Sequence, residues 1–250
     1  MLPNILKKVK NKITGKNNSA NEYTDMETEF KAIYEFCKPY TMTTIERMYA
    51  LFKAVEYIAK NNIEGDFIEC GVWRGGSTML MAKSLLYFGI SNRKIYLYDT
   101  YEGMSAPTSI DVTHEGNSAQ KLMQEQIENK KNASVWAIAG LEDVKKNLLS
   151  TAYPEKQLIF VKGKVEDTIP ETISTQIALL RLDTDWYEST RHELIHLYPV
   201  LVNKGVLIID DYGHWRGSRE ATDQYFKETK QSILLNRIDY TGRLGIKVNF

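Results

Sequence analysis

The sequence predicts an α/β fold: a mostly parallel sheet with helices on both faces and an antiparallel hairpin at its C-terminal edge. Two observations favour this fold. Short apolar runs typical of buried strands alternate along the chain with longer segments whose apolar residues recur at helical spacing, and such alternation produces parallel sheets covered by helices. Near the C-terminus, two strand-like runs lie on either side of Gly242, as expected of a hairpin.

The predicted elements follow in chain order. Residues 22–65 are expected to be helical, because the apolar residues between Ile45 and Ile58 form one broad face that ends before Asn61. Predicted strands then occupy residues 66–72, 94–99, 158–162, 177–182 and 205–210. Predicted helices occupy residues 77–88, 115–131, 142–149, 188–201 and 219–229. The hairpin strands are expected at residues 234–240 and 244–249.

Residues 22–250 are predicted to form a single domain, with a polar lid loop at about 104–118. Residues 1–21 are predicted to be a separate basic arm, because they contain five lysines and no acidic residue. The apolar residues of the arm have the spacing of a short amphipathic helix. Such an arm suits a peripheral contact with an anionic membrane surface, or a contact that joins the protomers of a homo-oligomer. A frayed tail is the alternative.

The composition argues against several classes of protein. The 32 basic and 32 acidic residues cancel, so no nucleic-acid partner is expected. The two cysteines, Cys37 and Cys70, have no metal-ligand spacing and fit a reducing compartment. No apolar run approaches the roughly 20 residues of a membrane span, and no apolar signal-peptide core follows the first lysines. A cytoplasmic protein is expected.

The loop after the first predicted strand favours a nucleoside ligand. Its glycines, from Gly71 to Gly76, allow a tight turn and a close approach of the backbone, and Ser77 opens a helix whose free N–H groups face an anion. The loop lacks the G-x-G-x-x-G of dinucleotide enzymes and suits a carboxylate, such as the amino-acid end of S-adenosylmethionine. Asp99 ends the second strand, where an acid can accept both ribose hydroxyls. A ligand-free turn and a capping role for Asp99 are the alternatives.

Four aspartates lie at the ends of two further strands. Asp183 and Asp185 follow one strand, and Asp210 and Asp211 end another. The carboxyl ends of adjacent parallel strands meet at one edge of the sheet, so these carboxylates are expected to lie close together. Carboxylates in such proximity resist full ionisation, and a bound Mg²⁺ would relieve their repulsion. Separate capping roles for Asp185 and Asp211 are the alternative.

Several other side chains are candidates for contact with an acceptor. His114 lies in the lid loop, and Tyr187, Tyr212 and Trp215 follow the aspartates and could stack on a ring. His192 and His196 are interpreted as ordinary helix residues, because their order is H-E-x-x-x-H rather than the zinc motif H-E-x-x-H.

Taken together, the segments I-E-C-G-V-W-R-G-G-S-T, Y-D-T-Y-E-G-M, R-L-D-T-D-W-Y-E-S-T and I-I-D-D-Y-G resemble the macrocin O-methyltransferase family. This family includes sugar O-methyltransferases of macrolide and aminocoumarin antibiotic biosynthesis. The resemblance runs from about Met42 to the I-D-Y-T-G near the C-terminus. It implies a class I methyltransferase fold, S-adenosylmethionine as methyl donor, Mg²⁺, and a small-molecule or glycoside acceptor with a sugar hydroxyl.

The resemblance also assigns roles to residues. It implies that Asp183, Asp210 and Asp211 bind the metal and that Asp185 is the general base. The residues expected to contact the cofactor are Thr43, Glu69, Gly71, Ser77, Asp99, Lys164 and Val165. Many relatives have D-G-D where this chain has Thr184 between its two acids.

Three other functions stay open at this point. A catechol-type O-methyltransferase would use similar metal chemistry on an aromatic diol. A glycosyltransferase could bind a sugar nucleotide and a metal through D-x-D, although the glycine loop and the paired Asp210 and Asp211 disfavour it. A non-catalytic nucleotide-binding scaffold would leave a complete base and metal cluster without a use.

Overall fold

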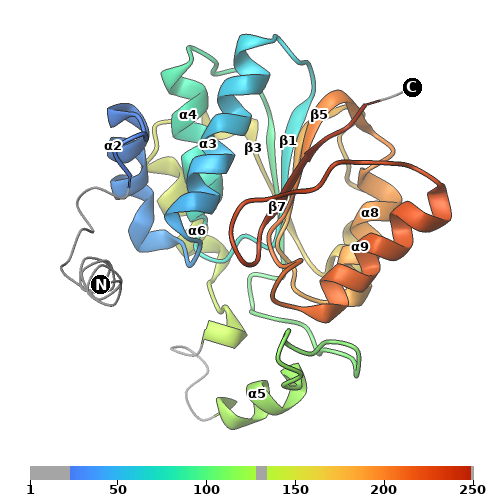
Figure 1. Cartoon of the computed structure of the whole chain (residues 1–250). Helices are drawn as coiled ribbons and strands as arrows, with labels where there is room; N and C mark the ends of the chain where they lie inside the picture. Colours follow the sequence, from blue (N-terminus) through green and yellow to red (C-terminus); the bar gives the residue numbers. More distant parts are fainter. Residues whose placement is uncertain (1–22, 128–133, 249–250) are drawn as a thin grey trace, which may run out of the picture.

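The computed structural model describes residues 23–127 and 134–248, and it contains one seven-stranded sheet in the order β3-β2-β1-β4-β5-β7-β6 (Figure 1). The strands from β3 to β5 run parallel, whereas β7 runs antiparallel to β5 and to β6. The strands are β1 (Asp66–Cys70), β2 (Ile95–Asp99), β3 (Leu158–Lys162), β4 (Ile177–Leu182), β5 (Leu201–Ile209), β6 (Asn236–Arg237) and β7 (Arg243–Ile246). The predicted sheet and its C-terminal hairpin are therefore confirmed.

Helices cover both faces of the sheet, as Figure 1 shows. Neighbouring strand residues serve opposite faces: Phe67 packs into the apolar cluster beneath α2, α3 and α4, whereas Ile68 packs with α8 and α9. The first face carries α2 (Thr28–Cys37), α3 (Ile45–Lys60), α4 (Gly76–Tyr87) and α6 (Leu141–Leu149). The second carries α7 (Val165–Thr168), α8 (Tyr187–Leu197) and α9 (Arg216–Thr229). The 3-10 helices are η1 (Lys38–Tyr40), η3 (Ser134–Trp136) and η4 (Glu155–Gln157).

The lid region packs over the carboxyl-end edge of the sheet. Its helix α5 (Ala119–Glu125) lies apart from both helical layers in Figure 1. A small apolar cluster of Ala119, Met123, Trp186 and Trp215 joins α5 to the segments that follow β4 and β5. The loop before α5 is fixed by Asp111, which is fully buried and accepts the backbone N–H of Tyr187 at 2.8 Å. The lid therefore covers the ends of the strands that were expected to carry the site.

The structure differs from the sequence prediction at a few elements. β5 begins at Leu201 rather than at residue 205, because Leu201 pairs with Ile177 across an irregular register and the polar residues that follow conceal the strand pattern. The helix expected at residues 115–131 is shorter, since α5 covers Ala119–Glu125 and residues 128–131 lie outside the described part. The short helix α7 was not predicted.

The basic arm, residues 1–21, lies outside the described residues, so its membrane and oligomer contacts stay predictions. Within residues 23–127 and 134–248, no helix combines the length and apolar character that spanning a bilayer requires.

Candidate active site

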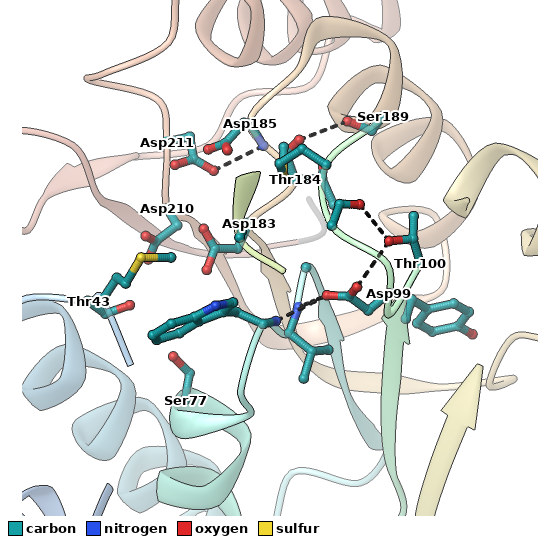
Figure 2. Close-up of a pocket in the computed structure, with 18 of the residues that line it drawn as sticks. Thr43, Ser77, Asp99, Thr100, Asp183, Thr184, Asp185, Ser189, Asp210 and Asp211 are labelled. Carbon is teal, nitrogen blue, oxygen red and sulfur yellow. Dashed lines mark hydrogen bonds between the residues drawn. The ribbon is translucent and has the colours of Figure 1, made fainter. Parts of the chain in front are cut away.

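A cavity of about 370 Å³ lies at the carboxyl ends of β1, β2, β4 and β5, which is the edge where open α/β sheets bind ligands. Figure 2 shows Asp185 and Asp211 together at one end of this cavity and Ser77 at the other. Eleven of the predicted site residues line it: Thr43, Gly71, Ser77, Asp99, Lys164, Val165, Asp183, Asp185, Asp210, Asp211 and Trp215.

Gly71 connects the glycine loop to the aspartates. Its φ of +81° lies in the left-handed region, and a Cβ at this position would lie 1.9 Å from the carbonyl oxygen of Asp183. Next to Gly71, the end of β1 is joined to the end of β4, because the Asp183 N–H donates a hydrogen bond to the Cys70 carbonyl at 2.8 Å. Only glycine combines this backbone conformation with this close approach. The geometry of the loop therefore fixes the start of the aspartate cluster.

Asp99 is oriented by the backbone around it. Its carboxylate accepts N–H groups from Val72 at 2.7 Å, Trp73 at 3.1 Å and Tyr101 at 2.7 Å. Burial raises the pKa of Asp99, and these hydrogen bonds oppose the rise. Thr100 Oγ1 also lies 3.5 Å from Oδ1, but its one proton has a closer acceptor, the Gly103 carbonyl at 2.6 Å. A carboxylate has about four lone-pair sites, so one site stays available to a ligand. Asp99 is thus a rigid acceptor facing the pocket that the glycine loop borders.

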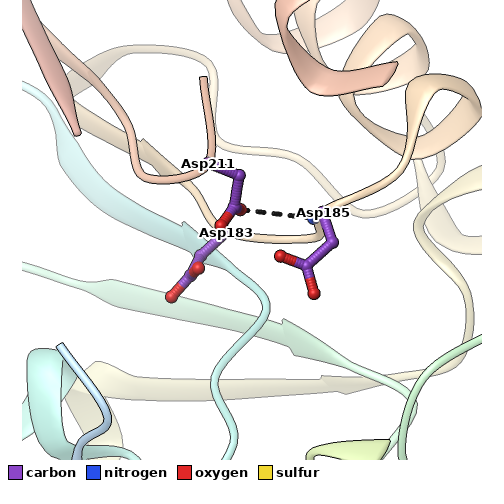
Figure 3. A group of neighbouring side chains, drawn as sticks. All are labelled: Asp183, Asp185 and Asp211. Atoms are coloured by element: carbon purple, nitrogen blue, oxygen red, sulfur yellow. Dashed lines mark hydrogen bonds between the residues drawn. The ribbon is translucent and has the colours of Figure 1, made fainter. Parts of the chain in front are cut away.

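Three carboxylates meet at the ends of β4 and β5. One oxygen each from Asp183, Asp185 and Asp211 lies within 4.8 Å of the others (Figure 3). The Asp185 backbone N–H donates to Asp211 Oδ2 at 3.3 Å, which connects the two segments directly. Asp185 has a left-handed φ of 65°, an uncommon conformation that aspartate tolerates better than most residues. The chain is bent at this point so that the carboxyl groups converge.

The electrostatics of this group favour a bound cation. Burial raises the pKa of Asp185 to about 7 and raises the pKa values of Asp183 and Asp211, with neighbouring carboxylates adding to each rise. Among the residues that the structure describes, neither Asp185 nor Asp211 forms an ion pair with a basic side chain. Asp183 does contact Arg181, at 2.7 Å, so within the described part of the chain two of the three converging carboxylates lack a cationic partner. Convergent carboxylate oxygens are the donor set that hard divalent cations prefer.

Asp210 has a different environment from the other three aspartates. Its two oxygens contact different guanidinium groups: Oδ1 lies 2.6 Å from Arg181 Nη2, and Oδ2 contacts Arg47 Nη1. Arg47 also lies 3.0 Å from Asp239 Oδ2, in the turn between β6 and β7. Asp210 therefore already has two cationic partners in this structure, although it lines the same cavity.

Arg181 contacts several of the buried acidic side chains. Its side chain is 2% exposed, and its Nη1 lies 2.6 Å from Glu69 Oε1 and 2.7 Å from Asp183 Oδ2. Its Nη2 also donates to Thr43 Oγ1 at 3.3 Å. Glu69 is itself buried, bonded also by Thr78, and does not line the cavity. The structure thus puts Glu69 beneath the pocket rather than in it.

Three of the acceptor candidates also lie outside the cavity lining. The Tyr187 hydroxyl donates to Gln224 and the Tyr212 hydroxyl donates to Asp223, both on α9. His114 lies at the rim, with its ring centroid 5.6 Å from that of His214, which does line the cavity.

Trp215 faces the cavity, and its ring packs edge-on against Trp186 with centroids 4.9 Å apart. It is the aromatic acceptor candidate that the structure brings to the aspartates.

Sequence reasoning did not single out Arg47, Tyr240 or Thr241 as site residues, although all three line the cavity. Arg47 is on α3, 163 positions before the aspartate that it contacts. No local motif marks such a pair. Arg47 is a basic residue on an otherwise apolar helix face, and this unusual placement is the signal that could have identified it.

Known proteins resemble this chain over most of its length. The family described as Macrocin-O-methyltransferase (TylF) matches residues 5–244. Demethyldecarbamoylnovobiocin O-methyltransferase of Streptomyces niveus is 33% identical over 74% of this chain and 67% of its own. A tetracenomycin-C 4'-O-methyltransferase of Streptomyces olivaceus, whose name specifies a 2,3-dimethoxy-alpha-L-rhamnosyl group, is 32% identical over 81% of this chain and 74% of its own.

Among solved structures, the O-methyltransferase NovP superposes with a TM-score of 0.72 at 30% identity, over 84% of this chain and 83% of NovP. The family match thus covers most of the chain, and the fold is shared with NovP. The chain therefore belongs to the macrocin O-methyltransferase family and is an S-adenosylmethionine-dependent O-methyltransferase.

Proposed function

We propose that this enzyme methylates a hydroxyl of a sugar, with assistance from Mg²⁺. The relative from Streptomyces olivaceus is named for a rhamnosyl compound, and two others are named for demethyldecarbamoylnovobiocin and mycinamicin III. The observation that carries the proposal for this chain is the convergence of Asp183, Asp185 and Asp211 within 4.8 Å, in the same cavity as the glycine loop and Asp99.

The cofactor would lie between the glycine loop and Asp99. Ser77 is in the first turn of α4, where free N–H groups favour an anionic carboxylate, and Asp99 offers acceptor oxygens to ribose hydroxyls. Thr43 closes the cavity from the start of α3, and Lys164 and Val165 close it from the start of α7. S-adenosylmethionine in this position would supply the methyl group next to the aspartates.

The residues present fit a divalent metal. Asp183 and Asp211 are ligands in our proposal, because their oxygens converge. Among the described residues Asp211 forms no ion pair, and Asp183 contacts Arg181 through Oδ2. Asp210 is the third metal ligand that the family resemblance implies. Each of its oxygens already contacts a guanidinium group, so one of these oxygens would have to bind the metal and a guanidinium group together. A bound Mg²⁺ would lower the pKa of an acceptor hydroxyl and fix its position.

Asp185 is the general base in this proposal. Its carboxylate lines the cavity, has no basic partner among the described residues, and has a pKa raised to about 7. A group of this kind can accept the hydroxyl proton as the oxygen forms its bond to the methyl carbon and the carbon–sulfur bond breaks. The proton thus goes to Asp185, and the sulfonium leaves as a neutral thioether.

Asp185→Asn and Asp210→Asn separate the two roles. Asp185→Asn should lose at least a hundredfold in kcat, with little change in Mg²⁺ affinity measured by calorimetry. Asp210→Asn should weaken Mg²⁺ binding, and excess metal should restore part of its activity. The reverse pattern would exchange the roles of the two residues.

The reaction itself is tested by mass spectrometry of glycosides and an aromatic diol incubated with S-adenosylmethionine and Mg²⁺, with and without EDTA. Transfer that EDTA does not affect would refute the metal, and methylation of the diol alone would favour a catechol-type acceptor.

A further inference from the structure

Within residues 23–127 and 134–248, four arginines near one wall of the cavity have no carboxylate partner. Arg216 and Arg219 begin α9, and Arg237 and Arg243 are on β6 and β7. Among the described residues these four form no ion pair, whereas Arg47, Arg74, Arg181 and Arg191 each do. Their guanidinium groups donate hydrogen bonds to neutral backbone carbonyls, such as Arg216 to His114 at 3.0 Å and Arg237 to Asp239 at 2.7 Å. We call these four residues the arginine cluster.

Arg219, Arg237 and Arg243 lie close to one another, and Arg216 is three residues before Arg219 on α9. The guanidinium carbons of Arg219 and Arg243 lie 5.4 Å and 4.9 Å from the centroid of the Tyr212 ring. Arg237 and Arg243 are direct partners in the pairing of β6 with β7. Burial, followed by the neighbouring charge of Arg237, lowers the pKa of Arg243. Positive charge is thus concentrated here without a matching acid.

The nearby acids are already engaged. Asp223 accepts the Tyr212 hydroxyl at 2.8 Å. Asp239 contacts Arg47 and accepts the N–H groups of Thr241 and Gly242 at 2.8 and 2.7 Å. A hydrogen bond from a neutral hydroxyl leaves Asp223 charged, whereas the charge of Asp239 is shared with Arg47. The four guanidinium groups still outnumber these two acids, and they repel one another unless an anion is bound.

The chain segments that carry the cluster border the cavity at the wall next to β5, although the four arginines are not themselves lining residues. His214, Trp215, Tyr240 and Thr241 line the cavity there, and the Gly213 N–H joins the two segments through the Thr241 carbonyl at 2.8 Å. Arg216 follows Trp215 directly, and Arg243 is two residues beyond Thr241. The glycine loop follows β1, two strands away in the sheet. An anion on the arginine cluster would therefore belong to the acceptor and not to the cofactor carboxylate.

We propose that the arginine cluster binds the pyrophosphate group of an acceptor whose sugar is linked to pyrophosphate. This inference rests on the proposed function, since it specifies the acceptor class of the same site. Guanidinium groups pair well with phosphate oxygens because their N–H donors match the spacing of those oxygens. Pyrophosphate-linked sugars have two sources, a nucleoside diphosphate sugar and a lipid-linked sugar, and the arginines recognise the chemistry that the two share.

The test compares acceptors that differ only in charge. The probes are nucleoside diphosphate sugars, a pyrophosphate-lipid-linked sugar in detergent, and uncharged methyl glycosides of the same sugars. The variant is Arg219→Gln/Arg237→Gln, because both side chains are exposed and should be removable without unfolding the domain. The matched control is Lys156→Gln/Lys227→Gln, which removes the same charge from exposed positions on η4 and late in α9.

The arginine variant should raise KM for the pyrophosphate-linked sugars at least tenfold, leave KM for methyl glycosides within twofold, and leave kcat unchanged. Inorganic pyrophosphate should compete with the acceptor in the unsubstituted enzyme and in the lysine control, but not in the arginine variant. A comparison of the nucleoside diphosphate sugars with the lipid-linked sugar identifies which of the two the enzyme accepts. Equal KM values for charged and uncharged acceptors would overturn the proposal.

Calorimetry with inorganic pyrophosphate separates the two hypotheses. If no acceptor is methylated but pyrophosphate binds the unsubstituted protein and not the arginine variant, the proposed function fails while the anion site stands. If pyrophosphate does not bind, the anion site is refuted even where methyl transfer to an uncharged glycoside succeeds.

Discussion

Gly71→Ala tests the link between the glycine loop and the aspartates. The added Cβ would lie 1.9 Å from the Asp183 carbonyl oxygen and 2.6 Å from its carbonyl carbon, and both are backbone atoms that cannot rotate away. The residue would also have to hold a φ of +81°. The substitution therefore strains β1 and displaces Asp183.

The cost can be worked from these two effects. A left-handed backbone costs an L-residue about 1–2 kcal/mol, and forcing extra atoms into a packed site costs about 1–3 kcal/mol. Together they predict a loss of about 2–5 kcal/mol of unfolding free energy, a large fraction of the stability of a typical domain. Displacement of Asp183 should also weaken Mg²⁺ binding about tenfold or more, equivalent to ~1.4 kcal/mol.

Urea unfolding followed by circular dichroism measures the stability, and calorimetry measures the binding of Mg²⁺ to the fraction that folds. Gly140→Ala is the matched control, because a Cβ there meets nothing within 4 Å and φ is −77°. That control should change stability by about 0.5 kcal/mol or less, since a weaker N-cap offsets the lower entropy of the unfolded chain. Equal stability and metal affinity in the two variants would refute the reasoning.

Three further predictions concern buried charges. Arg181→Met should lower the free energy of unfolding in urea by about 3–5 kcal/mol, because the buried carboxylates lose their shared partner. Added Mg²⁺ should recover part of that loss, and an unchanged urea midpoint would contradict the prediction. Burial raises the pKa of Glu193, so protein stability should fall as pH rises above the ordinary value of 4.5 toward the raised folded value. Glu193→Gln should show a smaller fall than the unsubstituted protein, because the aspartates of the site, whose pKa values are also raised, still contribute; an equal fall in the two proteins would contradict the assignment. Asp99→Asn should raise KM for S-adenosylmethionine, since an amide cannot accept all of its hydrogen bonds, whereas an unaltered KM would argue against a ribose contact.

The sequence was sufficient to predict the parallel sheet, because its strands contain short, mostly apolar runs with turn residues at their ends, although the polar residues early in β5 concealed where that strand begins. It also predicted the meeting of the aspartates, since Asp183 and Asp211 follow strands that lie side by side. That prediction needed only the rule that ligands bind at the carboxyl ends of parallel strands.

The partners of the aspartates could not be predicted in the same way. Arg181 looked like one residue of an apolar strand, and its contact with Glu69 depends on the pairing of β1 with β4. Arg47 reaches Asp210 because α3 packs across the sheet. Tyr187 and Tyr212 follow the right strands, yet their hydroxyls turn to α9. Side-chain direction at such positions is decided by tertiary packing, which spacing along the chain does not contain.

The left-handed backbone at Asp185 restricts which chemical groups this position can carry. Asn, Asp, His and Gly adopt such a φ far more readily than other residues do, and β-branched residues hardly adopt it at all. A glutamate would have a longer side chain but would strain the left-handed backbone. Saturation mutagenesis of Asp185 should therefore yield few folded enzymes with glutamate at this position. Histidine is the one alternative proton acceptor in that set, and redesign of this enzyme for a more acidic acceptor would begin there.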